Sequence, residues 1–279
     1  TPRPGRTLTR GGGFGPRVVI PLTSPPMIVQ YENHGRTAVI RLNRPEARNA
    51  VNQELAEALE EAIDRFEEDT GAWTAVLAAN GPSFCAGADL KAISGGATRL
   101  GTSRGGFAGL VQRERTKPLI AAVDGPAVAG GMELVLSCDL VVASTAARFG
   151  LPEVKRSLIA AAGGLFRLPR ALPRNLAMEM ALTGDHIDAA TAHRYGLVNR
   201  LVEPGDVVQA ALELAEEVNA NAPLAVRASR RAILASTLME EAEAFHLSSQ
   251  LSQEVFASED FAEGPRAFIE KRPPEWKGR

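Results

Sequence analysis

The sequence contains only two cysteines, Cys85 and Cys138, among its 279 residues. Both lie in apolar surroundings, so we interpret them as reduced core residues rather than as a disulfide framework. No apolar run approaches the roughly 20 residues that span a bilayer, and the N-terminus lacks the apolar stretch of a signal peptide. These absences predict a cytoplasmic protein that has no membrane partner.

The sequence also lacks a strong charge bias and a metal-binding pattern. Its 31 basic and 33 acidic side chains give a formal net charge of -2, which gives no reason to expect nucleic acid as a partner. His186 and His193 lie seven residues apart and would share one face of a helix. No third ligand accompanies them, so we expect solvated histidines and no bound metal.

Three motifs of common enzyme classes are missing as well. No Gly-x-Gly-x-x-Gly turn follows the first predicted strand, and the similar stretch at residues 11–15 lies in an N-terminal extension. The P-loop and the Gly-x-Ser-x-Gly nucleophile turn are absent too. These absences argue against nicotinamide enzymes, P-loop enzymes and serine hydrolases of the usual type, and we expect no separate cofactor.

The chain divides into three parts by composition. Residues 1–26 are rich in proline, glycine and arginine and have the character of an extension. Residues 27–205 alternate predicted strands and helices, and residues 206–279 are almost entirely helical. This order predicts an α/β fold. The βα units recur loosely, which fits a spiral as well as a doubly wound sheet.

Local patterns predict several elements. Apolar residues spaced by three and four predict a helix over 51–69, capped by Asn49 or Asn52. We expect a second helix to begin near Gly130 and residues 172–196 to form two helical pieces, whereas the glycine-rich residues 95–106 predict a flexible link. Short apolar runs predict strands in the segments 27–43, 74–80, 119–123, 139–144 and 197–203.

One carboxylate stands in the most apolar part of the chain. The stretch AGGMELVLSCDL, residues 129–140, contains Glu133. A lone buried carboxylate is costly unless it is paired, neutralised or used. The preceding glycines, Gly130 and Gly131, permit a ligand to approach the free N–H groups of a helix start. Glu133 is therefore either a working carboxylate or a residue that serves the helix N-terminus.

A second turn of small residues, Ala86-Gly87-Ala88, follows the strand at 74–80. If this turn faces Gly130, one N–H group from each turn can hold a single carbonyl oxygen, as in an oxyanion hole. The plain alternative is two structural turns, because glycine turns are common.

A second carboxylate, Glu153, lies 20 residues after Glu133. The chain between them runs out along a helix, back along a strand and around a turn, so the two side chains can meet. Two carboxylates around one water form an acid/base pair, and apolar surroundings raise at least one pKa. The alternative for Glu153 is an exposed ion pair with Lys155 or Arg156.

Five ordered segments resemble the crotonase family, the enoyl-CoA hydratases and isomerases, over about residues 27–279. The resemblance implies a spiral of ββα units with a C-terminal helical part that forms trimers, assembled as a homotrimer or a homohexamer. The segments that carry it are RLNRPEARNAVN (41–52), SFCAGADLKA (83–92), KPLIAAVDGPAVAGGMELVLSCD (117–139), FGLPEVKRSLIAAAGGLFRLPRAL (149–172) and ALTGDHIDAATAHRYGLVNRLV (181–202).

The resemblance also implies an acyl-CoA substrate and a set of site residues. The thioester oxygen would lie between the N–H groups of Ala88 and Gly130, and Glu133 and Glu153 would be the catalytic pair. Coenzyme A would enter as part of the substrate, not as a cofactor. The positions expected to bind it are Ala47, Arg48, Ala86, Gly87, Asp89 and Leu90.

The reaction implied is addition of water across the 2,3 double bond of a trans-2-enoyl-CoA. We take Glu133 as the base and Glu153 as the proton donor, and the reverse assignment stays open. An isomerase fits less well, because a double-bond shift needs one carboxylate and this chain keeps both. A non-catalytic acyl-CoA-binding member of the fold would be expected to have lost one of them.

Two further stretches resemble one branch of the family, the carnitinyl-CoA dehydratases, which hydrate crotonobetainyl-CoA. These are GGFAGLVQRERTKPLIAAVDG (105–125) and the ending EGPRAFIEKRPPEWKGR (263–279). Ala129 stands where many hydratases have glycine, and AAAGG (160–164) stands where many have Pro-Gly-Ala-Gly-Gly. Both changes affect the expected acyl preference, and neither removes a catalytic group. The basic C-terminal residues would either reach the phosphates of coenzyme A or form a solvated tail.

Overall fold

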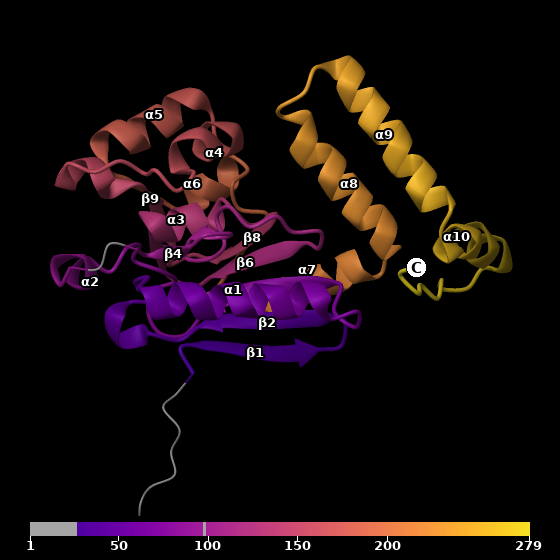
Figure 1. Cartoon of the computed structure of the whole chain (residues 1–279), viewed down its shortest axis with the longest axis horizontal. Coiled ribbons are helices and arrows are strands. Elements are labelled where there is room, and N and C mark those ends of the chain that lie inside the picture. Colours follow the sequence, from indigo (N-terminus) through magenta and orange to yellow (C-terminus); the bar gives the residue numbers. More distant parts are fainter. Residues whose placement is uncertain (1–26, 97–98) are drawn as a thin grey trace, which may run out of the picture.

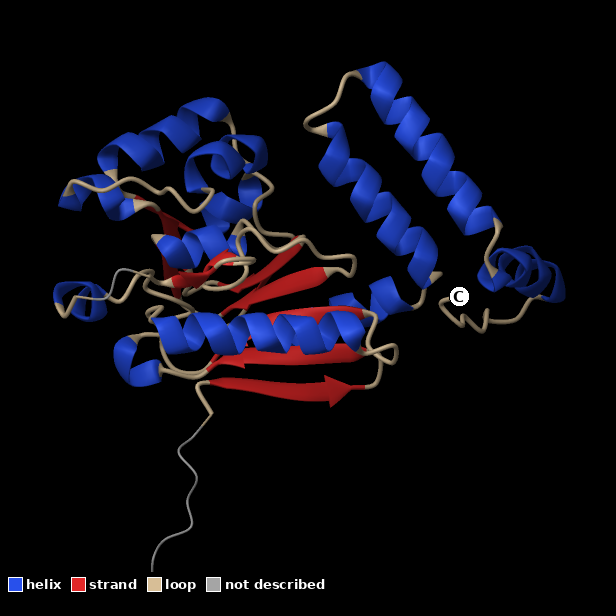
Figure 2. Cartoon of the chain, viewed as in Figure 1, coloured by secondary structure: helices blue, strands red, loops and turns tan. Residues whose placement is uncertain are grey.

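The computed structural model describes residues 27–96 and 99–279, and the predicted extension 1–26 lies outside the described residues (Figure 1). A six-stranded sheet forms its centre, in the order β1-β2-β3-β6-β8-β11 (Figure 2). β1 runs antiparallel to β2, and the other neighbouring pairs are parallel. These strands are β1 (Val29–His34), β2 (Thr37–Leu42), β3 (Thr74–Ala79), β6 (Leu119–Val123), β8 (Leu140–Ser144) and β11 (Arg200–Val202).

A smaller sheet has the order β10-β9-β7, formed by β10 (His186–Asp188), β9 (Arg148–Gly150) and β7 (Pro126–Val128). The chain passes from the large sheet to the small one at each turn, because β7 follows β6 and β9 follows β8. An isolated bridge between Cys85 and Ala127 adds the segment after β3 to the same series. This alternation between two sheets is a spiral, one of the two arrangements that the sequence left open.

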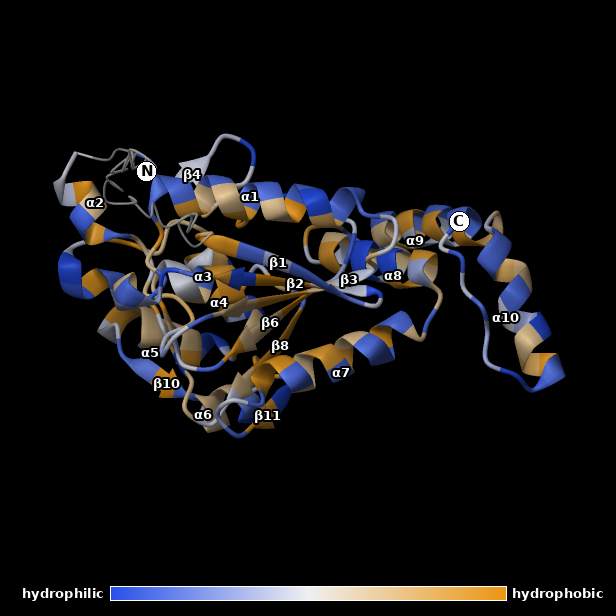
Figure 3. Cartoon of the chain, turned by 90° about the horizontal axis from the view of Figure 1, so that it is seen from below, coloured by the Kyte–Doolittle hydropathy of each residue, from blue (hydrophilic) through white to orange (hydrophobic). Residues whose placement is uncertain are grey.

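The helices on the two faces of the large sheet explain its alternating side chains. In β3, Leu77 belongs to the main core cluster, which includes α1, whereas Val76 belongs to a second cluster with α7. Figure 3 shows α7 beside the hydrophobic strands β6 and β8. Helices α8, α9 and α10 project away from the sheet (Figure 1). The division of the chain at residue 206 stays a prediction, although α7 itself packs on the sheet.

Most predicted elements are present in the structure, with a few differences. Asn52, not Asn49, caps α1, and its side chain accepts from the Leu55 N–H at 2.9 Å. His186 lies in β10 and His193 in α6, so they do not share a helix. The helices are η1 (Pro45–Ala47), α1 (Gln53–Glu68), α2 (Leu90–Ser94), α3 (Gly130–Val135), η2 (Pro152–Arg156), α4 (Gly164–Ala171), α5 (Arg174–Thr183), α6 (Ala189–Arg194), α7 (Val207–Asn219), α8 (Pro223–Ser236), α9 (Glu241–Phe256) and α10 (Glu259–Glu270).

The glycine-rich segment expected to be a link contains a small hairpin, β4 (Gly101–Thr102) and β5 (Gly106–Phe107). A Cβ on Gly109 would lie 2.8 Å from the Glu60 Cβ, so the chain just after the hairpin packs closely on α1. The glycines therefore serve close packing here, which a composition-based prediction of a flexible link overlooks.

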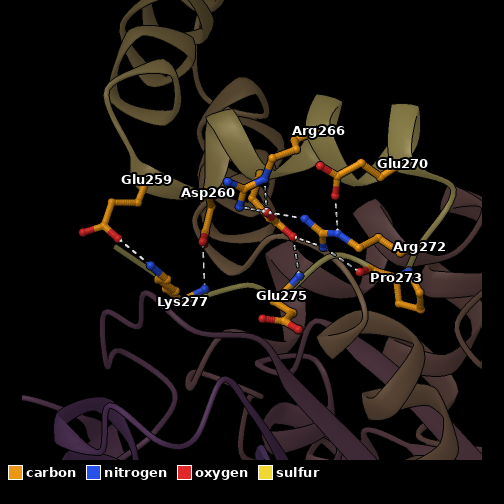
Figure 4. Close-up of polar contacts among 9 residues, drawn as sticks. Glu259, Asp260, Arg266, Glu270, Arg272, Pro273, Glu275 and Lys277 are labelled. Carbon is orange, nitrogen blue, oxygen red and sulfur yellow. Dashed lines mark hydrogen bonds and ion pairs between the residues drawn. The ribbon is translucent and has the colours of Figure 1, made fainter.

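The C-terminal tail folds back over α10 through two buried carboxylates (Figure 4). Asp260 accepts from the N–H groups of Lys277 (2.7 Å) and Gly278 (2.8 Å). Glu263 accepts from Arg272 at 2.5 Å and also from Arg266. Lys277 and Arg279 pair with Glu259. These basic residues form ion pairs within the chain while Lys277 and Arg279 stay largely exposed to solvent, and their role in CoA binding stays a prediction.

We expect Glu263→Gln to lower the midpoint of urea unfolding at neutral pH, because the amide offers Arg272 and Arg266 no opposite charge. Hydrogen bonding from Arg272 holds the pKa of the Glu263 carboxyl well below its usual range. The stabilisation is thus present above the ordinary glutamate pKa of 4.5 and is lost as the pH falls through the lower folded pKa. The gap between variant and wild type should shrink toward about pH 3. Equal midpoints for the two proteins at neutral pH would contradict this role, and Glu275→Gln serves as the exposed control.

Candidate active site

The two turns of small residues meet in the structure. Gly87 has φ +90°, and a Cβ on it would lie 2.9 Å from the Gly130 backbone nitrogen and 2.8 Å from the Ala129 Cβ. The small sheet brings them together, since the Val128 N–H donates to the Cys85 carbonyl at 3.1 Å. The condition set by the sequence, that the turn at 86–88 faces Gly130, is met.

The N–H groups of Ala88 and Gly130 have no hydrogen-bond partner among the described residues. Gly130 begins α3, where the first N–H groups of a helix lack intrahelical acceptors. Gly131 packs directly on the chain just before the turn at 86–88, because a Cβ on Gly131 would lie 2.8 Å from the Cys85 carbonyl carbon. Two free donors on adjacent turns are what an oxyanion hole requires.

Ala129, the residue before the donor Gly130, has an unusual backbone conformation, with φ 52° and ψ -128°. This region of φ/ψ space is favourable for glycine and costs other residues about 1–3 kcal/mol. The Ala129 N–H donates to the Gly150 carbonyl (2.9 Å), and its carbonyl accepts from the Glu133 N–H (3.1 Å). Hydrogen bonds on both sides therefore hold the strained residue in place.

We expect Ala129→Gly to raise the free energy of unfolding by about 1 kcal/mol, because relief of strain exceeds the backbone entropy that glycine adds. Thermal or urea unfolding measures the change. The matched control is Ala127→Gly, two residues earlier in the buried strand β7, which should lower stability. A loss of stability in both variants would show that Ala129 is not strained.

Glu133 lies in the first turns of α3 and is 4% exposed. Its Oε1 accepts from the Gly164 N–H at 2.9 Å, at the start of α4. Burial raises the pKa of the Glu133 carboxyl, and hydrogen bonds from the Gly164 and Ala162 backbones and the nearby Arg167 charge oppose that rise. The side chain thus binds to another helix and does not serve the N-terminus of its own.

Glu153 lies in η2, which directly follows β9. Its Oε2 is a buried atom that has no hydrogen-bond partner among the described residues. Burial raises the pKa of the Glu153 carboxyl, and the neighbouring Glu133 charge raises it further. The alternative of an ion pair with Lys155 is not supported, because Lys155 pairs with Asp185 at 2.6 Å. The charge of Arg156 opposes the rise in the Glu153 pKa, but the two side chains form no ion pair in the described part of the chain.

Glu133 and Glu153 lie close enough for the Glu133 charge to raise the pKa of the Glu153 carboxyl, and their joint catalytic role stays a prediction. Both pKa values are raised, and each carboxylate belongs to a different turn of the spiral. Two interacting carboxyls titrate as a pair, in which one gives up its proton before the other. Such a pair can hold one group as acid and the other as base at the same pH.

The predicted CoA-binding positions lie on two loops that backbone hydrogen bonds join side by side. The Ala86 N–H donates to the Arg48 carbonyl (3.0 Å), the Val51 N–H to the Gly87 carbonyl (2.8 Å) and the Asp89 N–H to the Val51 carbonyl (2.9 Å). The loop that carries Ala47 and Arg48 is thus joined to the loop 86–90. Leu90 is 50% exposed at the start of α2.

Asp89 has contacts within the protein that sequence reasoning did not foresee. Its carboxylate caps α2 by accepting from the Lys91 (3.1 Å) and Ala92 (3.2 Å) N–H groups, and it pairs with Arg44 at 3.0 Å. The Arg44 side chain also donates to the Ala50 carbonyl at 2.5 Å. Asp89 therefore holds the loop in shape, because its backbone N–H and carbonyl are also bonded, to the Val51 carbonyl and the Ile93 N–H.

Three other residues were missed by sequence reasoning. Asn49 is fully buried and donates to the Asn80 (2.9 Å) and Ser83 (2.8 Å) carbonyls, which fixes the loop before Cys85. The ring of Phe107 covers Gly130, since a Cβ on Gly130 would lie 2.5 Å from the ring atom Cζ. Arg167 in α4 lies close enough to Glu133 for its charge to act on that carboxylate. The only available signals were an asparagine amid loop residues, an aromatic residue between glycines and an arginine in an amphipathic helix.

Comparison with known proteins assigns the chain to a family. A family model described as enoyl-CoA hydratase/isomerase matches residues 32–279. The chain belongs to the enoyl-CoA hydratase/isomerase family. This result confirms the crotonase resemblance inferred from the sequence.

Relatives across this family align over nearly their whole length. A protein named enoyl-CoA hydratase EchA19 from Mycobacterium tuberculosis is 42% identical over 89% of this chain and 96% of its own. A carnitinyl-CoA dehydratase from Proteus mirabilis is 39% identical over 88% of this chain and 96% of its own. A crystal structure of an enoyl-CoA hydratase from Mycobacterium tuberculosis has a TM-score of 0.88 at 46% identity, over 91% of this chain and 100% of that one.

These relatives confirm the predicted α/β crotonase fold and show that the chain is an enzyme of this family. In the described part of the chain, no three histidine, cysteine or acidic side chains gather into a set that would bind a metal. None of its helices is long and apolar enough to cross a bilayer.

Proposed function

We propose that this enzyme hydrates a trans-2-enoyl-CoA thioester. The observation that carries the proposal is the approach of a buried glutamate, Glu133, to the half-buried Glu153, on turns that also carry two unpartnered N–H groups. The Ala88 and Gly130 N–H groups would hold the thioester oxygen, and the enolate formed on that oxygen would bind more tightly than the ground-state carbonyl. A pair of carboxylates suits addition of water better than a double-bond shift, which needs only one.

In the proposed reaction, water held between the two carboxyls attacks C3 of the enoyl group. Glu133 takes the proton that the water loses, the C2=C3 electron pair forms the C1=C2 bond of an enolate, and the carbonyl pair moves onto the thioester oxygen. Glu153 then gives its proton to C2, which completes the 3-hydroxyacyl product. A proton passes between the coupled carboxyls before the next turnover, so the pair returns to its starting state. The reverse roles of the glutamates give the same net reaction.

Coenzyme A would lie along the joined loops 47–51 and 86–90 in this proposal. The exposed Arg48 side chain offers a charge there, and the half-exposed Leu90 offers apolar surface. Arg48 has a left-handed backbone with φ 52°, which turns its carbonyl toward the Ala86 N–H. No separate cofactor takes part in the reaction as proposed.

We expect a bell-shaped dependence of kcat/KM on pH. Glu133 must be ionised to act as base, and its pKa is raised by burial, so activity should fall on the acid side at a pH above the ordinary value of 4.5. Glu153 must hold its proton, and its pKa is raised by burial and by Glu133, so activity should fall again as the pH rises through that value. Rates measured from the ordinary glutamate pKa of 4.5 up to alkaline pH would show both limbs. A flat profile would contradict the paired roles.

The reaction is tested by offering purified enzyme crotonyl-CoA, a longer trans-2-enoyl-CoA, a 3-enoyl-CoA and crotonobetainyl-CoA, with mass analysis of the products. The proposal predicts gain of one water with the first two substrates. Hydration of crotonobetainyl-CoA alone would support the alternative of a carnitinyl-CoA dehydratase, which a relative at 39% identity represents. Only a double-bond shift in the 3-enoyl substrate, without net gain of water, would exclude a hydratase. Binding without turnover would support a non-catalytic acyl-CoA-binding member.

We also propose a homotrimer, or a hexamer built from two trimers, with contacts through the C-terminal helices. Large apolar side chains are exposed along these helices, which soluble monomers rarely leave in quantity. The most exposed of them are Ile233, Leu238, Phe245, Phe256, Phe268 and Ile269. Sedimentation or light scattering would give the mass directly. The free thiols Cys85 and Cys138 suit a reducing compartment, so the cytoplasm remains our proposed location.

A further inference from the structure

Arg167 is a charged residue within α4 that the proposed reaction leaves without a role. Its Nη2 donates to the Val111 carbonyl at 2.6 Å, and its Nη1 donates to the Ser137 hydroxyl at 2.9 Å. Both acceptors are neutral. Glu133 supplies the nearest acidic charge that acts on this guanidinium, whose pKa is lowered by burial. A desolvated cation with neutral hydrogen-bond partners needs an explanation.

The hydrogen bonds of Arg167 lead to the backbone of Glu133. The Ser137 hydroxyl, which accepts from Arg167, donates in turn to the Glu133 carbonyl at 2.7 Å. Arg167 in α4 is therefore connected through Ser137 to the main chain of a glutamate in α3. The link fixes where the Cα of Glu133 stands relative to α4.

The other end of Glu133 is held by the turn that the guanidinium packs against. The Glu133 Oε1 accepts from the Gly164 N–H at 2.9 Å. A Cβ on the preceding Gly163 would lie 2.8 Å from the Arg167 Nη1, so the guanidinium lies in contact with this turn. The backbone N–H of Arg167 also donates to the Gly163 carbonyl at 3.0 Å, as the first turn of α4 requires. One side chain thus supports both the backbone of Glu133 and the donors that hold its carboxylate.

We propose that Arg167 is a positioning residue for Glu133. It joins α4 to α3, so that the Glu133 main chain and the N–H groups on its carboxylate keep a fixed separation, and its charge favours the ionised form of Glu133. The proposal rests on the proposed function only for its kinetic consequence. The effect on Glu133 itself holds whatever the substrate is.

The surrounding charges set what removal of Arg167 should do. Arg167 from α4 is the charged group that acts on Glu133, and the Glu133 charge acts in turn on Glu153 in η2, which the charge of Arg156 also affects. Arg115 and Arg170 are the other cations near Arg167, and the thiol of Cys138 is its other titratable neighbour. Without the Arg167 charge, burial acts on Glu133 against the two backbone hydrogen bonds alone, so the pKa of its carboxyl should rise.

The test compares Arg167→Met, Arg167→Lys and Ser137→Ala with the exposed control Arg170→Met. We expect Arg167→Met to lower kcat for crotonyl-CoA about 10²-fold, since a misplacement of about 1 Å can have that effect. KM should change little, and the acid limb of the pH profile should move to higher pH. Arg167→Lys keeps the charge but cannot donate to both Ser137 and Val111. Its kcat should therefore fall, while the acid limb of the pH profile should stay near its original pH. Ser137→Ala should also lower kcat, because it breaks the link from Arg167 to the Glu133 carbonyl. The control Arg170→Met should keep the kcat and the pH profile of the wild type.

A second measurement tests the role of Arg167 independently of the proposed reaction. Carboxyl-¹³C-labelled glutamate, assigned with Glu133→Gln, reports the titration of Glu133 directly by NMR in the wild type and in Arg167→Met. An inactive wild type would count against the proposed function, while a higher Glu133 pKa in the variant would still support positioning. Unaltered kcat together with an unshifted Glu133 titration would overturn the role of Arg167. If Arg167→Met does not fold, wild-type kcat in both Arg167→Lys and Ser137→Ala would overturn it equally.

Discussion

Glu133→Gln should lower kcat for crotonyl-CoA hydration by about 10²–10⁴-fold, the usual contribution of a general base. The amide is nearly the same size, and its oxygen can still accept from the Gly164 N–H, so α3 and α4 should keep their places. Stability should not fall, because a neutral amide avoids the desolvation that raises the pKa of this carboxyl. The measurement compares the initial rates of Glu133→Gln and wild type, and unfolding curves of both proteins check that stability is retained.

The control for this variant is Glu179→Gln in α5, an exposed glutamate outside the proposed site. It should retain wild-type turnover. Substrate binding to Glu133→Gln should be preserved, since the CoA loops and the free N–H groups lie on other residues. A Glu133→Gln enzyme that hydrates crotonyl-CoA at the wild-type rate would remove Glu133 from the reaction.

Gly130→Ala should lower kcat by about 10²–10³-fold, the loss expected when one oxyanion donor no longer reaches its acceptor. The added methyl would lie 2.5 Å from the Phe107 Cζ and 3.3 Å from the Gly87 Cα, so Gly130 must shift away from both. Its N–H moves with it. KM should change less than kcat, because the donors act mainly on the enolate.

A second substitution tests the steric cause of this loss. Phe107→Ala removes the ring that the methyl would strike, so Gly130→Ala combined with Phe107→Ala should recover part of kcat relative to Gly130→Ala alone. Gly264→Ala in α10 is the glycine control, because a Cβ there would make an ordinary contact of 3.5 Å with Trp276. Equal activity of Gly130→Ala and wild type would show that the Gly130 N–H is not a donor in the reaction.

The sequence predicted those parts of the fold and site that depend on local pattern. The strand at 119–123 is found with the expected bounds because a short apolar run has few alternatives. Glu133 and Glu153 stood out because a carboxylate in an apolar run is rare, and the turns at Gly87 and Gly130 because glycines mark close backbone approach. The resemblance to a family then gave the order of these pieces a meaning.

The rest depends on contacts between distant segments, which no local pattern records. The strand β10 is three residues long and forms only because β9 lies beside it. Asn49 was a candidate cap, yet its amide is bonded to carbonyls more than 30 residues away. Nothing in the local sequence singles out Arg167, and its connection to Glu133 requires Ser137 from the turn that follows α3.

The central claim is that Glu133 and Glu153 act together on one water. The most direct measurement is the rate of crotonyl-CoA hydration by wild type, Glu133→Gln, Glu153→Gln and the double variant under one set of conditions. Groups that act as a unit are not additive, so the double variant should be within about tenfold of the slower single variant. Losses that multiply, or a single variant with wild-type turnover, would contradict the account.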